Sequence, residues 1–143
     1  KPDDAALIED LLQRMMENRA DFTLTFRALC DAAVGPEGDA VARALFKDAN
    51  AFDEWAVKWR ARLAEDGGDP KARRDAMRAV NPRYIPRNHR VEEAIAAAVH
   101  GDYAPFETLV TVLSRPFDDQ PELARYADPP RPEEVVYQTF CGT

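Results

Sequence analysis

Residues 52–63 read FDEWAVKWRARL, with Phe52, Trp55, Trp59 and Leu63 at positions i, i+3, i+7 and i+11. This spacing places the large apolar side chains on one face of a long amphipathic helix. Aromatic rings at helical spacing are typical of core packing, so we interpret the two tryptophans as core residues rather than as a ligand-stacking box. Gly67-Gly68 is expected to end this helix.

The same helical pattern continues in both directions along the chain. Apolar residues recur at helical spacing from Leu7 to Met16, and Asp21 is expected to cap a following helix whose apolar face includes Cys30. Asp69 is expected to cap another helix that has Pro70 at its first position. A short helix is expected near residues 41–46, and Asp102 is expected to cap the last one. The inner faces of the last two helices are expected to carry Val91, Ile95, Ala98 and Val99, and Phe106, Leu109, Val110 and Leu113.

These patterns predict an all-α fold of about six or seven helices. A length of 143 residues suits one compact domain, which we place at residues 1–126. A Pro-rich, irregular C-terminal tail is expected over residues 127–143. Cys141 lies near its end, third from the C-terminus. No alternating strand of convincing length is found.

Composition excludes several kinds of partner. The 26 acidic residues outnumber the 19 basic ones, which gives a formal net charge of −7. General nucleic-acid binding and attachment to an anionic membrane both need a basic face, so neither partner is expected. No uncharged apolar run reaches the roughly 20 residues that a membrane span requires.

The setting of the chain is inferred from its first residues and its cysteines. The N-terminus, Lys1-Pro2-Asp3-Asp4, has neither an initiator Met nor a hydrophobic signal region, so we expect a chain processed or cut from something larger. Two cysteines far apart in sequence do not form a secreted disulfide framework. We therefore expect a cytoplasmic, reducing setting.

One loop gathers basic side chains in this acidic chain. Arg83, Arg87, Asn88 and His89 lie just before or at an expected helix start, where a phosphate or carboxylate is well placed to bind. The alternative is structural: Asn88 caps the helix, and the arginines pair with nearby carboxylates. Both interpretations stay open from the residues alone.

Cys141 is the better candidate for a reactive thiol, since Cys30 lies on an apolar helix face and is interpreted as buried. Redox exchange, metal capture and docking onto another surface are the three explanations for a cysteine so close to the chain end. His89 and His100 have no Cys or His at metal-site spacing, so no metal site is expected.

Taken together, several segments resemble the C-terminal part of the selenoprotein O family of protein adenylyltransferases. The resemblance is strongest at residues 81–89, NPRYIPRNH, and extends over essentially the whole chain. The other segments that carry it are Asp21-Phe22-Thr23, Thr25-Phe26-Arg27, Phe52-Asp53-Glu54-Trp55, Glu92-Glu93-Ala94-Ile95, Gly101-Asp102, Pro105-Phe106, Arg115-Pro116-Phe117, Pro129-Pro130 and Thr139-Phe140-Cys141-Gly142-Thr143.

The resemblance implies a parent enzyme with a kinase-like core that binds ATP in an inverted orientation. That core transfers AMP to protein hydroxyls with the help of Mg²⁺ or Mn²⁺. Cys141 matches the position that selenocysteine occupies in some members, which favours the redox explanation. None of the family's catalytic motifs maps onto residues 1–143, so no catalytic residue is assigned and the isolated chain is expected to be inactive.

Three hypotheses follow for this chain. In the first, it supports or regulates the missing N-terminal kinase-like core of the same protein, contacts it through the Arg83–Arg90 loop, and carries Cys141 as a redox element. In the second, it is a stand-alone helical interaction module without catalysis. In the third, it is a small enzyme that uses Arg87, Asn88 and His89, although no nucleophile, metal set or matched carboxylate pair accompanies them.

Overall fold

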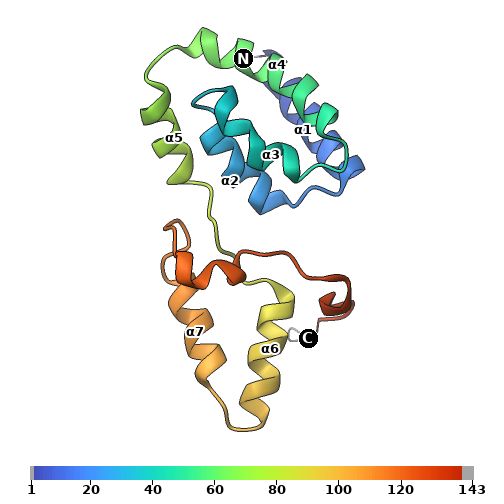
Figure 1. Ribbon diagram of the computed structural model, residues 1–143, viewed down its shortest axis with the longest axis vertical. Helices are drawn as coiled ribbons and strands as arrows, with labels where there is room; N and C mark the ends of the chain where they lie inside the picture. Colours follow the sequence, from blue (N-terminus) through green and yellow to red (C-terminus); the bar gives the residue numbers. More distant parts are fainter. Residues whose placement is uncertain (1, 140–143) are drawn as a thin grey trace. The chain divides into compact units, whose positions relative to one another are not determined.

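Helices account for all the regular secondary structure in residues 2–139, which are the residues that the computed structural model describes (Figure 1). The α-helices are α1 (Pro2–Asn18), α2 (Phe22–Ala32), α3 (Asp39–Ala44), α4 (Ala49–Asp66), α5 (Pro70–Arg78), α6 (Asn88–Val99) and α7 (Ala104–Leu113). Three 3₁₀ helices, η1 (Pro36–Gly38), η2 (Pro121–Tyr126) and η3 (Pro132–Glu134), complete the set in this part of the chain. The all-α prediction, with about six or seven helices and an irregular C-terminal region, is confirmed.

Backbone contacts divide the chain between Asn81 and Pro82 into two compact units. We call residues 1–81 the N-terminal unit and residues 82–143 the C-terminal unit, and describe each by itself. The expected division into 1–126 and 127–143 stays a prediction. Within residues 2–139, no helix is both long enough and apolar enough to cross a membrane.

Two predicted caps are present where the sequence placed them. The Asp21 carboxylate accepts a hydrogen bond from the Leu24 backbone N–H at 2.9 Å. Asp69 accepts from the Ala72 N–H at 3.0 Å, and Pro70 is the first residue of α5. Each carboxylate satisfies a backbone donor that the first helical turn leaves without an intrahelical partner.

The start of α7 differs from the prediction by one residue. Tyr103, not Asp102, holds the N-cap position, and the Asp102 carboxylate accepts from the Ala104 N–H at 3.0 Å. Pro105 follows at the second helical position and has no N–H for a side-chain cap to bind. Asp102 therefore reaches the donor one residue earlier.

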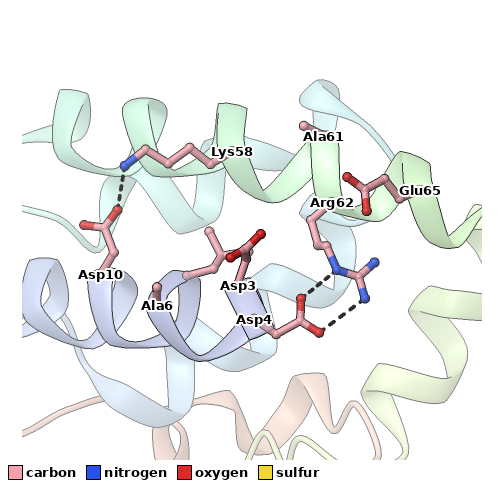
Figure 2. Close-up of a pocket in the computed structure, with 9 residues that line it drawn as sticks. Asp3, Asp4, Ala6, Asp10, Lys58, Ala61, Arg62 and Glu65 are labelled. Atoms are coloured by element: carbon pink, nitrogen blue, oxygen red, sulfur yellow. Dashed lines mark hydrogen bonds and ion pairs between the residues drawn. The ribbon is translucent and has the colours of Figure 1, made fainter. Parts of the chain in front are cut away.

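In the N-terminal unit, α1 lies along α4 and polar side chains join the two helices (Figure 2). The Arg62 Nε atom donates to Asp4 Oδ1 at 2.6 Å, and Lys58 Nζ donates to Asp10 Oδ2 at 2.9 Å. Trp55 Nε1 donates to the Leu7 carbonyl at 2.9 Å. These bonds fix which face of α4 is turned toward α1.

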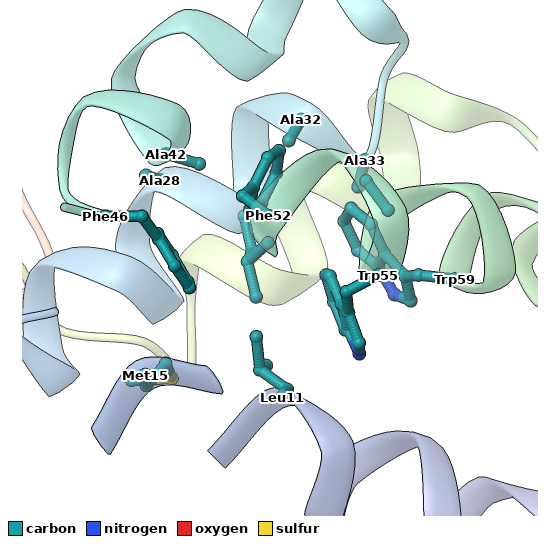
Figure 3. Close-up of a cluster of buried hydrophobic side chains, with 12 residues drawn as sticks. Leu11, Met15, Ala28, Ala32, Ala33, Ala42, Phe46, Phe52, Trp55 and Trp59 are labelled. Carbon is teal, nitrogen blue, oxygen red and sulfur yellow. The ribbon is translucent and has the colours of Figure 1, made fainter. Parts of the chain in front are cut away.

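An aromatic row from α4 fills the core of the N-terminal unit (Figure 3). Phe52 is completely buried, and its ring centroid lies 5.6 Å from that of Phe46 and 6.2 Å from that of Trp55. Trp55 and Trp59 stack with centroids 5.1 Å apart and planes 20° apart. The core interpretation of both tryptophans is confirmed. The row packs against Leu11, Met15, Ala28, Leu29, Ala32, Ala33 and Ala42.

Cys30 is fully buried in α2, as the apolar pattern predicted. Its Sγ atom lies 3.4 Å from the Phe26 carbonyl and donates to it. Burial raises the pKa of the Cys30 thiol, because a thiolate loses its hydration there. The thiol form is therefore favoured at neutral pH.

In the C-terminal unit, α6 and α7 run antiparallel and are joined by a short turn (Figure 1). The predicted inner faces are partly wrong. Ile95 and Val99 are exposed, while Ala94 of α6 is buried instead. On α7, Leu109 is buried as expected, but Phe106 and Val110 are exposed.

Candidate functional site

The loop that precedes α6 is tied to the segment after α7. The Arg83 and Tyr84 backbone N–H groups both donate to the Pro116 carbonyl, at 2.8 and 3.2 Å. The Tyr84 hydroxyl donates to the Gln120 carbonyl at 3.0 Å and accepts from the Gln120 N–H at 3.2 Å. Tyr84 is only 1% exposed, so these bonds are shielded from water.

Gln120 is the residue of this region that sequence reasoning missed. Its Nε2 atom donates to the Val112 carbonyl at 3.1 Å and to the Arg115 carbonyl at 3.0 Å. The last carbonyls of a helix have no intrahelical donor, so the buried amide of Gln120 satisfies that end of α7. A glutamine in an irregular segment carries no pattern that predicts such a contact.

Arg83 takes a structural position within this loop. Its Nη1 atom lies 3.4 Å from Asp119 Oδ1, and its guanidinium lies 5.9 Å from the centroid of the Tyr84 ring. This pairing is the one that the structural interpretation of the loop expects. Arg83 does not line the hollow that the other three candidate residues share.

The neighbouring Arg90, like Arg83, pairs with a carboxylate and lies near a tyrosine ring. Its Nη1 atom donates to Glu93 Oε2 at 3.0 Å, and its guanidinium lies 5.9 Å from the Tyr126 ring centroid. Arg125 also approaches this group, with its guanidinium 4.7 Å from the Tyr126 ring and 3.6 Å from Glu93. Two arginines, one carboxylate and one aromatic ring thus link α6 to η2.

Arg87, Asn88 and His89 mark the start of α6. Arg87 occupies the N-cap position without a capping side-chain hydrogen bond, and Asn88 is the first helical residue. The expectation that Asn88 caps the helix is therefore wrong. Arg87 and His89 are both 8% exposed, whereas Asn88 is exposed.

His89 is buried without a hydrogen-bond partner for its Nε2 atom. Burial lowers the pKa of His89, because the imidazolium loses its hydration, and the nearby positive charge of Arg90 lowers it further. Both effects favour the neutral imidazole over the imidazolium.

Three of the four candidate residues line one hollow. It has a volume of about 290 Å³, and its described walls are Ile85, Pro86, Arg87, Asn88, His89, Pro130, Val135 and Val136. These walls offer nitrogen groups and apolar surface but no carboxylate, hydroxyl or thiol. Such a lining has polar and apolar groups that can recognise another molecule but has no nucleophile, and the His89 imidazole is the one side chain among these walls that can exchange a proton near neutral pH.

The 3₁₀ turn η3 of the C-terminal tail is held by hydrogen bonds between two of its own residues. In η3 the Arg131 backbone N–H donates to Glu134 Oε2 at 2.9 Å, and Arg131 Nη2 donates to Glu134 Oε1 at 2.9 Å. Both bonds lower the pKa of Glu134, to about 2, and the bond from the Arg131 side chain has the larger effect. Glu134 and Val136 also line a second hollow of about 330 Å³, next to His89 and Glu93.

The N-terminal unit has a pocket that the sequence did not suggest, between α1 and α4 (Figure 2). Its volume is about 420 Å³ and its lining includes Asp4, Asp10, Lys58 and Arg62. Hydrogen bonding to Arg62 holds the pKa of Asp4 well below its usual range, and hydrogen bonding to Asp4 raises that of Arg62. The pairs Asp4–Arg62 and Asp10–Lys58 therefore join the two helices, and Asp3 and Glu65 add two further carboxylates to the lining.

Two features considered in the sequence, a metal centre and a reactive thiol, remain to be located. Within residues 2–139, no group of three or more His, Cys, Asp or Glu side chains is arranged to hold a metal ion. Cys141, the candidate redox residue, lies outside the described residues.

Comparison with known proteins identifies the class to which this helical chain belongs. A sequence profile of the family described as protein adenylyltransferase SelO matches residues 1–114. The chain belongs to the SelO family, as the resemblance predicted.

Curated relatives from several bacteria match the chain along nearly its whole length. The protein nucleotidyltransferase YdiU of Nitrobacter winogradskyi is 59% identical over 140 residues, which cover 98% of this chain and 28% of the relative. The protein of the same name from Rhodopseudomonas palustris strain BisB5 is 59% identical over 142 residues, or 99% of this chain and 29% of the relative. That of Bradyrhizobium diazoefficiens is 60% identical over 141 residues, or 98% and 28%. The chain thus spans less than a third of the length of these relatives.

Proposed function

We propose that this chain is the C-terminal helical part of a protein adenylyltransferase and that it supports or regulates a kinase-like core. In the proposed reaction a protein hydroxyl oxygen bonds to the α-phosphorus of ATP, pyrophosphate leaves, and the hydroxyl proton passes to solvent or a base. The proposal rests on the match to the Nitrobacter winogradskyi protein nucleotidyltransferase YdiU. That match covers 98% of this chain but only 28% of the relative, as expected for one part of a longer enzyme.

ATP and its metal ion are assigned to the rest of the longer protein. The family implies ATP with Mg²⁺ or Mn²⁺, which are bound by carboxylates and phosphate-cradling loops. Within residues 2–139 no group of three or more His, Cys, Asp or Glu side chains is arranged to hold such an ion, so these residues do not fit it.

The loop Arg83–Arg90 is proposed to contact the kinase-like core. Tyr84 and the backbone of the loop are fixed by Gln120 and Pro116, so the exposed Asn88 side chain is presented from a rigid base. Preorganised surfaces lose little conformational entropy on docking, which favours an interaction role.

The test of the enzymatic part is AMP transfer from ATP by the full-length protein, compared with residues 1–143 alone. We expect the full-length protein to add the mass of AMP to a protein substrate and residues 1–143 to add none. Transfer by residues 1–143 alone contradicts the supporting role. Absence of transfer by the full-length protein, tested with Mg²⁺ and with Mn²⁺, contradicts the adenylyltransferase assignment.

Cys141 is proposed as the redox element, paired with a thiol of the missing core. Peroxide is the oxidant that we name: the two thiols lose two electrons and two protons, the disulfide forms, and the peroxide is reduced to water. Mass spectrometry of the full-length protein, with and without peroxide, checks this step. We expect a Cys141-containing disulfide or another oxidised form of Cys141 only in the oxidised sample, while the buried Cys30 stays reduced. A Cys141 that remains a free thiol throughout contradicts the proposal.

A further inference from the structure

Five apolar side chains of the α6–α7 hairpin are exposed although the sequence pattern expects most of them to be buried. The exposed fractions are 50% for Ile95, 78% for Val99, 60% for Tyr103, 53% for Phe106 and 51% for Val110. Tyr103 lies in the turn between the helices, and the other four lie in α6 and α7. We call these five residues the hairpin face.

Helix geometry places the two helical rows of the hairpin face on the same side. Ile95 follows the buried Ala94, and Val110 follows the buried Leu109, so each lies about 100° further around its helix than a buried position. α6 and α7 contact each other as an antiparallel pair (Figure 1), and we take the sides that carry the buried Ala94 and Leu109 as the sides that face each other. Because the two helices run in opposite directions, the same rotation from the facing sides leads to the same side of the hairpin.

The formally charged residues of the hairpin itself all have one sign. Residues 91–114 contain four acidic residues and no Lys or Arg. Glu93 is paired with Arg90 and Arg125, whereas Glu92 and Glu107 have no ion pair among the described residues. The apolar surface therefore has an acidic rim.

We propose that the hairpin face docks onto an apolar surface with a Lys- or Arg-rich rim in the remainder of the full-length protein. This inference rests on the proposed function, in which the chain is one part of a longer enzyme. More than two thirds of each relative lies outside the matched region, so most of the surface that the chain meets is absent here. Contiguous exposed apolar patches mark interaction sites, and opposite charges at the rim select the partner.

A second copy of the chain fits the hairpin face less well. Two copies that meet through this face bring Glu92 and Glu107 of one copy close to the same acidic residues of the other. Like charges across an interface are unfavourable, so the acidic rim argues for a basic partner rather than for self-association.

The experiment compares two variants of the full-length protein, Val99→Cys and Val57→Cys, which each add one cysteine. The measured quantity is the rate at which the added thiol is alkylated. Val57 is the matched control, since it is also a helical valine and is 70% exposed against 78% for Val99. We expect Cys at position 99 to be alkylated at least about tenfold more slowly than Cys at position 57, because docking blocks access to the thiol. Peptide mass spectrometry locates the label and separates it from Cys30 and Cys141.

Reversing the rim charge is the second arm. The double substitution Glu92→Lys and Glu107→Lys in the Val99→Cys protein is expected to return the rate at position 99 toward that at position 57. Glu9→Lys, an exposed change in α1, is the charge control and is expected to leave the rate unchanged. Recovery only with the rim substitutions supports the basic partner surface, and equal recovery with Glu9→Lys overturns it.

The other outcomes separate docking from function. Equal rates at positions 99 and 57 in a full-length protein that transfers AMP overturn the docking proposal and leave the proposed function standing. Slow alkylation at position 99 in a protein that transfers no AMP supports docking and contradicts the function. The oligomeric state is measured by sedimentation while the protein is diluted. If position 99 is alkylated slowly in a dimer but rapidly in the diluted monomer, a second copy covers the hairpin face and the proposal is overturned.

Discussion

Tyr84 anchors the loop before α6 through one hydroxyl that both donates to and accepts from the backbone of Gln120. The residue that the sequence offered only as a neighbour of basic side chains is thus a main support of the loop. Its ring is buried, so neither Gln120 group finds water as a ready substitute.

Tyr84→Phe is predicted to destabilise the C-terminal unit by about 1–3 kcal/mol, because it leaves the buried Gln120 N–H without its acceptor. The Gln120 carbonyl loses one donor but keeps the Leu123 N–H at 3.0 Å. Urea unfolding followed by amide NMR signals of α6 and α7 checks the value. Tyr137→Phe is the control and is expected to change little, since Tyr137 is 92% exposed. Equal effects from the two substitutions contradict the anchoring role of the hydroxyl.

At the residue scale, the sequence predicted the burial of side chains that recur at helical spacing. Phe52, Trp55, Trp59 and Cys30 are buried because apolar spacing on a helix fixes their side of it. Gln120 was not predicted, since its contacts join an irregular segment to the end of α7 and leave no periodic trace. The contact of Asn88 with the kinase-like core and the redox role of Cys141 stay predictions.

At the scale of the helix, the start signals of α2 and α5 were interpreted correctly, whereas those of α6 and α7 were not. Asp69 and Pro70 together specify where α5 begins, because the carboxylate supplies a missing acceptor and Pro supplies the right backbone angle. The glycines just before this start adopt positive φ values, 64° for Gly67 and 81° for Gly68. Glycine adopts such angles readily, so α4 ends where the sequence expected.

Asp69→Ala is predicted to lower the free energy of unfolding of the N-terminal unit by about 0.5–2 kcal/mol, because it removes the cap of α5. Asp69→Asn keeps an acceptor oxygen and is expected to lose less. Urea denaturation monitored by circular dichroism measures both. A loss from Asp69→Asn as large as that from Asp69→Ala is inconsistent with capping as the cause.

The turn η3 is predicted to open in acid. The pKa of Glu134 lies at about 2, below its usual 4.5, so the folded turn favours the carboxylate. Its contribution is fully present above about pH 4.5 and is lost as the pH falls through about 2. The Arg131 amide chemical shift, followed by NMR over this range, reports the change.

Glu134→Gln is the control for this titration, since the amide keeps an acceptor oxygen and does not ionise. We expect the Arg131 shift to lose its pH dependence in this variant. An unchanged titration in Glu134→Gln shows that another group is responsible.

The faces of α6 and α7 show where sequence patterns stop being sufficient. Both helices have more apolar residues than one buried face accommodates, so the pattern predicts the helices but not which row turns inward. Ala94 is buried and Val99 is exposed. Small residues let the two helices approach closely, which places the larger side chains outside.

At the scale of the whole molecule, the all-α class followed from the sequence, whereas the division between Asn81 and Pro82 did not. Asn81–His89 was interpreted as a non-helical loop inside one domain. Whether a loop separates two compact units depends on contacts that are distant in sequence, and a local pattern does not record them. Family membership was predictable because it rests on the order of several short motifs along the chain.

Phe52→Ala is predicted to destabilise the N-terminal unit by about 3–5 kcal/mol, because Phe52 is fully buried among aromatic neighbours and its loss leaves a cavity. Val57→Ala, an exposed change on the same helix, is expected to stay within about 0.5 kcal/mol of the unchanged protein. Urea unfolding with NMR signals of α2 and α4 compares the two. Similar losses from both variants contradict the placement of the core.

The stacked pair Trp55 and Trp59 gives the molecule a built-in optical label. Both tryptophans of the chain belong to the N-terminal unit, and all four tyrosines, Tyr84, Tyr103, Tyr126 and Tyr137, belong to the C-terminal unit. Indole emission excited at long wavelength therefore reports one unit, and phenol emission reports the other. The unmodified protein thus carries two separate fluorescent reporters, so the melting of each unit can be followed in a single sample without a dye.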